Sequence, residues 1–242
     1  MRPFTLGRLA DLIRLVQTMH GVTVDQVEEA MMVTEDRALE LLKQAEEMGL
    51  VKCDGALYYS TSLGNIFFEA FIRGDKSKLD GVLNEYAPYF KIKSAISRKS
   101  TDVEELKRLT GLTEVAIEIV LRLLQYTCDN LCFMDERIFL STKELPKSAD
   151  FFSVLKNAYL EFSKFAQWGC SKNFIRVDKV AIHVCQELRL SLDDFSKMLS
   201  KILDSDYPID LYSEGMSYQF MPFVNRKINP SSYRKCYIRI RT

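Results

Sequence analysis

The sequence has little of what most catalytic and metal-binding proteins use. Only two histidines occur in 242 residues, His20 and His183, and the chain has neither a glycine-rich phosphate loop nor a nucleophile-elbow motif. No apolar run approaches the ~18 residues that a membrane span needs. The N-terminal residues 1–4 also lack the apolar core of a secretory signal. These absences predict a cytoplasmic protein that is neither an enzyme nor held in a membrane.

Cysteines are few and scattered. They stand at positions 53, 128, 132, 170, 185 and 236. A structural zinc site takes about four ligands, usually in pairs at short spacing, and only Cys128 with Cys132 and His183 with Cys185 come near such spacing. Disulfide-stabilised secreted domains are shorter and richer in cysteine. We therefore expect reduced, mostly buried thiols, with no metal and no cofactor.

An excess of charge of one sign is also missing. The chain carries 33 Lys and Arg against 33 Asp and Glu, while 47% of its residues are hydrophobic, which is enough for real cores. Zero net charge argues against attraction of the whole molecule to nucleic acid, but local patches still exist. Residues 1–75 hold 7 basic and 12 acidic side chains, residues 76–147 hold 12 and 11, and residues 148–242 hold 14 and 10. Basic charge is thus concentrated in the last part of the chain.

What the sequence does contain is a repeat. Residues 22–61 and 101–142 share a pattern that aligns Val33-Thr34-Glu35 with Leu112-Thr113-Glu114, and a looser third copy begins at Leu190. In each copy, apolar residues at helical spacing predict a short helix, and a Thr or Ser before acidic residues predicts the N-cap of a second helix. Thr34, Thr113 and Ser191 are these predicted caps.

Each copy then ends in two strand-like runs around a turn. The predicted pairs are 51–53 with 56–59 around Asp54-Gly55, 131–134 with 137–140, and 209–212 with 216–220. A leading helix is predicted before each copy, over 6–16, 79–90 and 151–165, with Pro88 disturbing the end of the second. A further helix is expected over 63–72. Alternation over residues 236–241 predicts a terminal strand that extends the third sheet or pairs with the edge of a partner.

This order of helices and hairpins resembles the winged helix-turn-helix family, three times over. The expected fold class is therefore mainly α with short β-hairpin wings (α+β), in tandem winged helix-turn-helix domains at 1–75, 76–147 and 148–242. The resemblance implies association with DNA, in transcription regulation or another DNA transaction. In this family the second motif helix enters the major groove.

The charged side chains on the solvent side of the second helix of each copy indicate where nucleic acid is expected to bind. Copy one presents mainly acids, among them Glu35, Asp36 and Glu40, which departs from the family pattern because they would repel phosphate. A basic C-terminal segment with Tyr233 and Tyr237 is the first candidate for phosphate contact. The next candidates are the basic residues that precede the second copy and those on the second helix of the third copy. The candidate residues are Arg226, Lys227, Arg234, Lys235, Arg239, Arg241, Lys91, Lys93, Arg98, Lys99, Lys197 and Lys201.

Two other interpretations stand beside this one. The basic segment has the composition of a solvated terminal strand, or of a patch that docks on the acidic first module. The whole chain also fits a protein-interaction scaffold, in which winged-helix modules bind a protein partner or a second copy and never touch nucleic acid. Apolar residues on the solvent side of the helices would favour the scaffold.

Overall fold

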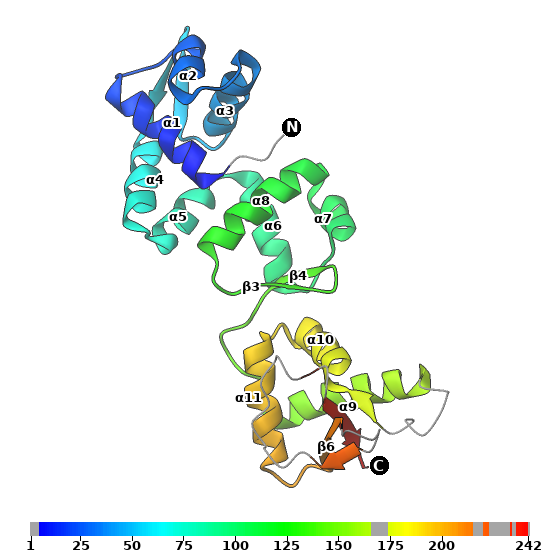
Figure 1. The fold of residues 1–242 in the computed structure, drawn as a ribbon. Coiled ribbons are helices and arrows are strands. Elements are labelled where there is room, and N and C mark those ends of the chain that lie inside the picture. The colour runs from blue at the N-terminus through cyan, green and yellow to red at the C-terminus, as the bar shows by residue number, and fades with distance from the viewer. Residues whose placement is uncertain (1–4, 166–173, 215–219, 223–232, 234–235, 242) are drawn as a thin grey trace. The chain divides into compact units, whose positions relative to one another are not determined.

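The structure is a computed structural model, and it describes residues 5–165, 174–214, 220–222, 233 and 236–241. These residues form a mainly helical α+β fold with short antiparallel strands, as the sequence predicted (Figure 1). The chain divides into two compact units. The first unit holds residues 1–96 and 102–131, and the second holds residues 97–101 and 132–242.

The first unit begins with three helices, a two-stranded sheet and a fourth helix. The elements are α1 (Leu6–Thr18), α2 (Val24–Met31), α3 (Glu35–Glu47), β1 (Val51–Asp54), β2 (Leu57–Ser60) and α4 (Ser62–Arg73). β1 and β2 pair antiparallel, with Val51 opposite Ser60. The predicted inner face of α3, which includes Ala38, Leu41 and Leu42, is buried. The predicted elements are confirmed here within one or two residues.

Four further helices follow, and one prediction among them is wrong. They are α5 (Lys76–Leu83), α6 (Ala87–Arg98), α7 (Val103–Thr110) and α8 (Glu114–Thr127). The single helix expected over 79–90 is two helices, and Pro88 lies in the first turn of the second one instead of disturbing the end of the first. A proline is tolerated there because the first N–H groups of a helix have no intrahelical acceptor.

The three predicted cap residues all occupy N-cap positions. Thr113 accepts a hydrogen bond from the backbone N–H of Ala116 at 3.3 Å, and Ser191 accepts one from that of Asp194 at 3.1 Å. Thr34 precedes α3 with extended backbone but makes no side-chain cap bond. The cap chemistry predicted from the sequence is therefore present at two of these three positions.

The hairpin of β3 (Leu131–Met134) and β4 (Arg137–Leu140) occurs where the sequence predicted it, and it turns through Asp135 and Glu136, both at positive φ. Apart from Leu131, its residues belong to the second unit. Phe139 is fully buried in that unit's core, and the side-chain amide of Gln186 donates to the Met134 carbonyl at 2.9 Å.

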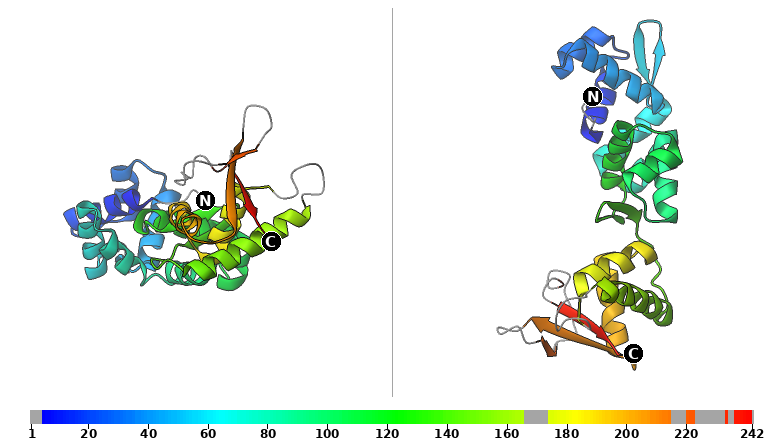
Figure 2. Two further views of the ribbon diagram at one scale, coloured as in Figure 1. Left: turned by 90° about the horizontal axis from the view of Figure 1, so that it is seen from below. Right: turned by 90° about the vertical axis from the view of Figure 1, so that its right-hand side faces the viewer.

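The second unit packs three helices against a four-stranded antiparallel sheet. The elements are α9 (Ser148–Phe165), β5 (Ile175–Arg176), α10 (Val177–Leu188), α11 (Leu192–Leu203), β6 (Ile209–Glu214), β7 (Phe220–Pro222) and β8 (Cys236–Ile240). The strand order is β5-β8-β6-β7, so the predicted terminal strand does extend the third sheet (Figure 2). Phe195, Met198 and Leu199 of α11 are buried in the core, as predicted. No helix among the described residues has the length and apolar character that a bilayer span requires.

Candidate nucleic-acid interface

The candidate cations around α6 differ in their surroundings. Lys91 and Arg98 on α6, and Lys99 just after it, are exposed. Lys93 is half-buried, and its ammonium donates to both carboxylate oxygens of Asp80 at 2.6 and 2.5 Å. Because Asp80 neutralises this charge within the first unit, Lys93 is poorly suited to a phosphate.

Asp80 and Lys93 belong to a polar cluster that joins α5, α6 and α8. The Tyr89 hydroxyl donates to Asp80 at 2.6 Å and lies 2.7 Å from the hydroxyl of Thr127, which donates to the Leu123 carbonyl at 3.0 Å. Burial favours the neutral form of Asp80, but hydrogen bonds from Lys93 and Tyr89 and the charge of Lys93 together lower the pKa of this carboxyl.

The surroundings of the same cluster also raise the pKa of two of its groups. Burial raises the pKa of the Cys128 thiol, whose sulfur lies 3.8 Å from Asp80, and the nearby carboxylate raises it further. Burial and the hydrogen bond to Asp80 raise the pKa of Tyr89 well beyond its usual range. The hydrogen bonds of Asp80, Tyr89 and Thr127 join α5, α6 and α8.

α11 brings two candidate cations together on one exposed face. Lys197 and Lys201 are one turn apart and both are exposed. The Lys197 ammonium lies 2.8 Å from Asp194, and this hydrogen bond is the main reason that the pKa of Asp194 is lowered. Asp194 also accepts from the Ser191 hydroxyl at 2.7 Å. The Asp194 carboxylate therefore contacts both Ser191, the cap residue of α11, and Lys197.

At the C-terminal end, the described candidates are Arg239 on β8 and Arg241 just after it. The Arg239 guanidinium lies over the Phe174 ring at 5.9 Å from its centroid, and Arg241 Nε is 3.4 Å from Asp210 Oδ2. The candidates Arg226, Lys227, Arg234 and Lys235 lie outside the described residues.

One tyrosine of the basic segment is not at the surface. Tyr233 is 3% exposed, and its ring meets that of Phe195 edge-on at 5.7 Å. Its hydroxyl hydrogen-bonds to Ser196, and burial raises its pKa. Tyr233 is therefore a core residue, which corrects its grouping with an exposed basic and aromatic segment, whereas Tyr237 is only half-buried.

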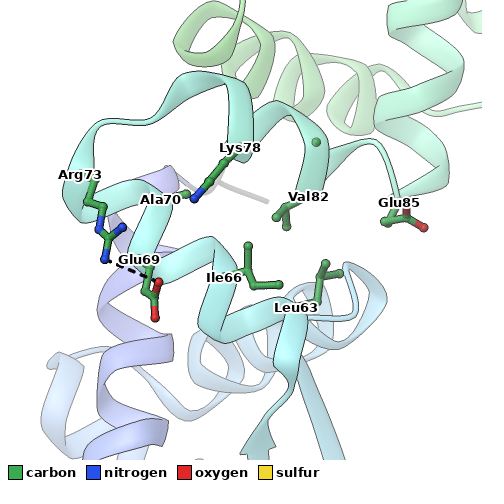
Figure 3. A pocket seen from close by; sticks show the side chains of 9 residues that line it. Leu63, Ile66, Glu69, Ala70, Arg73, Lys78, Val82 and Glu85 are labelled. Atoms are coloured by element: carbon green, nitrogen blue, oxygen red, sulfur yellow. Dashed lines mark ion pairs between the residues drawn. The ribbon is translucent and has the colours of Figure 1, made fainter.

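A groove of about 490 Å³ runs between α4 and α5 in the first unit, and sequence reasoning missed it. Figure 3 shows Leu63 and Ile66 of α4 facing Val82 of α5 across it. The charged side chains on its rim include Glu69 and Arg73, which lie 3.9 Å apart. Ile66 is 48% exposed, and an apolar floor of this kind suits an apolar segment rather than a phosphate backbone.

Among the described residues, no group of three His, Cys, Asp or Glu side chains is placed to hold a metal ion. His183 Nε2 lies 3.4 Å from Glu187 and 3.9 Å from Glu161. Cys185 and Cys236 are buried, and burial raises the pKa of Cys185 above the usual thiol range. The predicted burial of thiols is confirmed for these two, while Cys53, Cys128 and Cys132 are partly exposed.

Comparison with known proteins gives no relative. No protein-family model matches the chain, and neither a curated protein nor a solved structure matches it.

Proposed function

We propose that the chain is a non-enzymatic protein of tandem winged-helix modules that associates with DNA through its second unit. The observation that carries the proposal is the pair α10 and α11, joined by a short turn and followed by an antiparallel sheet, with Lys197 and Lys201 exposed on α11. In a winged helix-turn-helix the second of these helices lies in the major groove and the strands that follow touch the backbone.

The charges of the two units support this assignment. Residues 97–101 and 132–242 carry 19 basic and 13 acidic side chains, whereas residues 1–96 and 102–131 carry 14 basic and 20 acidic ones. α3, the equivalent helix of the first unit, carries five acidic and two basic side chains, whereas α11 carries two of each, with Lys197 paired to Asp194 at 2.8 Å. Since phosphate contacts supply most of the affinity for DNA, α11 is the better candidate of the two helices.

The test is a titration of labelled duplex DNA, followed by fluorescence anisotropy at several salt concentrations. We expect Lys197→Ala with Lys201→Ala to weaken binding of all duplex sequences and to reduce the salt slope by up to about 1.8, because each lost phosphate contact removes about 0.9. Lys43→Ala, an exposed lysine on α3, is the matched control and should change neither quantity. Absence of binding at low salt would contradict the proposal.

A second candidate function is the protein-interaction scaffold, and the groove between α4 and α5 favours it. Besides Ile66 beside the groove, Ile72 on α4 is 66% exposed and Phe90 on α6 is 56% exposed. Exposed apolar patches commonly mark protein contacts. If a second copy covers α4, sedimentation should show concentration-dependent dimers that Ile72→Asp abolishes and that Lys43→Ala leaves intact. A chain that is monomeric at all concentrations would exclude this self-association.

A further inference from the structure

The four-stranded sheet of the second unit has a buried face and a partly exposed face. Ile175, Leu211 and Ile238 point into the core and are at most 7% exposed. Side chains alternate along strands, so the neighbouring residues point the other way. In one row across three strands, Arg176 of β5 is opposite Tyr237 of β8, which is opposite Tyr212 of β6. All three are partly exposed.

Another aromatic ring joins this row. Phe174, directly before β5, meets Tyr212 edge-on with ring centroids 4.8 Å apart. The Arg239 guanidinium lies over the Phe174 ring, within the range of a cation–π contact. We call the set Phe174, Arg176, Tyr212, Tyr237 and Arg239 the outer sheet face. It gathers three aromatic rings and two guanidinium groups on one side of a sheet whose other side is the core.

The charges around the outer sheet face indicate which ligand suits it. Arg176 Nε donates to Asp178 at 3.0 Å, and Asp210 lies opposite Arg239 and is paired with Arg241. Among the residues named here, three guanidinium groups stand against two carboxylates, which is a small positive excess. Such an excess guides a phosphate strand but supplies little affinity by itself, so stacking on the rings has to supply the rest. A duplex hides the faces of its bases, whereas a single strand presents them.

We propose that the outer sheet face binds single-stranded nucleic acid by stacking unpaired bases on Tyr212 and Tyr237, with Arg239 and Arg241 beside the phosphates. This inference rests on the proposed function, because it assigns a second nucleic-acid surface to the same basic unit. It differs from the duplex surface on α11 in the side chains that carry it, so the two can be tested separately.

The test uses the full chain and two labelled probes of about 12 nucleotides, oligo(dT) and oligo(U), a length within the range of about 4–16 nucleotides that a small β-fold covers. We expect Tyr237→Leu and Tyr212→Leu each to weaken binding of at least one probe by roughly 5- to 150-fold, the effect of losing one stacked base. Tyr237→Phe keeps the ring and should bind as the wild type does. The two probes distinguish a DNA ligand from an RNA ligand.

The control is Tyr126→Leu, which removes a tyrosine that is 38% exposed on α8 and stacked with Phe71 in the first unit. It should leave both affinities unchanged. Tyr212→Leu and Tyr237→Leu should leave duplex binding unchanged, because the proposed contacts to duplex DNA come from α11. If the wild type binds duplex but neither single strand, the inference is wrong and the proposed function stands. If it binds no nucleic acid at all, both are wrong.

A second measurement needs no variant and therefore does not depend on how the substitutions fold. Oligomers with 4-thiothymidine are crosslinked to the wild-type chain by ultraviolet light, and the adducts are located by mass spectrometry. Adducts on Phe174, Tyr212 or Tyr237 are expected. Adducts confined to α11, or to the groove between α4 and α5, would overturn the assignment of the outer sheet face.

Discussion

Gly64, in the first turn of α4, stands where no side chain fits. A Cβ atom at this position would lie 2.1 Å from the Leu50 carbonyl oxygen and 3.0 Å from Ser60 Oγ. Gly64→Ala must therefore move backbone, and we expect it to lower the free energy of unfolding by about 2–4 kcal/mol. Urea denaturation measures the change.

Gly81 on α5 is the matched comparison, because a Cβ there meets no atom within 4 Å. Gly81→Ala should raise the free energy of unfolding by about 0.5–1 kcal/mol, since alanine has the higher helix propensity. Equal effects of the two substitutions would mean that the close approach of α4 to the Leu50 carbonyl is wrong.

The ion pair of Asp80 with Lys93 makes folding stability depend on pH. The pKa of the Asp80 carboxyl is below the unfolded-chain value of about 3.9, so its stabilisation is complete above that value and is lost as pH falls through the folded pKa. At pH 7, Asp80→Asn should cost about 1–3 kcal/mol, because the Lys93 ammonium loses its partner. Below about pH 4, the difference between variant and wild type should shrink.

Urea denaturation of both proteins between pH 7 and pH 3 checks this. Asp129→Asn is the control, since Asp129 pairs with Lys76 at the surface and is 80% exposed. Its effect should stay within about 0.5 kcal/mol at pH 7, as for other exposed ion pairs. A difference for Asp80→Asn that does not change with pH would show that the ionised carboxylate is not the source of the stabilisation.

Two threonines at the N-caps of helices differ in whether the side chain accepts a hydrogen bond from the helix. Thr113 and Thr34 both precede a helix and have similar backbone angles, but only Thr113 bonds to a helix N–H. Thr113→Ala should therefore cost about 1 kcal/mol, and Thr34→Ala only a few tenths. Thermal unfolding of the two variants measures the difference. Equal losses would indicate that Thr34 caps α3 in solution as well.

Element positions follow from the sequence wherever local chemistry decides them. Apolar spacing located α1, α3 and α11, and alternation located β8. Helical spacing over 79–90 does not indicate the break between α5 and α6, where Tyr86 and Tyr89 are both buried, one on each side of Pro88. Strand order was open as well: alternation gives β8 one apolar face but does not say which strands it will pair with.

The candidate nucleic-acid interface draws on several helices and strands, and the sequence predicts only part of it. Lys197 and Lys201 are on an exposed face because helical spacing alone puts them opposite Phe195 and Leu199. Lys93 could not be judged, because its partner Asp80 comes from another helix. The outer sheet face was missed entirely, since it depends on β5 pairing with β8 and β8 with β6. The three-module division itself stays a prediction.

The division into two compact units makes a prediction about Phe139. This residue follows α8 in the sequence, yet it is buried in the core of the second unit with Phe151 and Phe195. Phe139→Ala should cost about 3–5 kcal/mol, and the loss should appear as faster hydrogen exchange in α10 and α11 while α1 and α3 keep their protection. Phe67→Ala, an equally buried phenylalanine of the first unit, should do the reverse. If Phe139→Ala instead exposes the amides of α1 and α3, the β3–β4 hairpin belongs to the core of the first unit and the division of the chain must be redrawn.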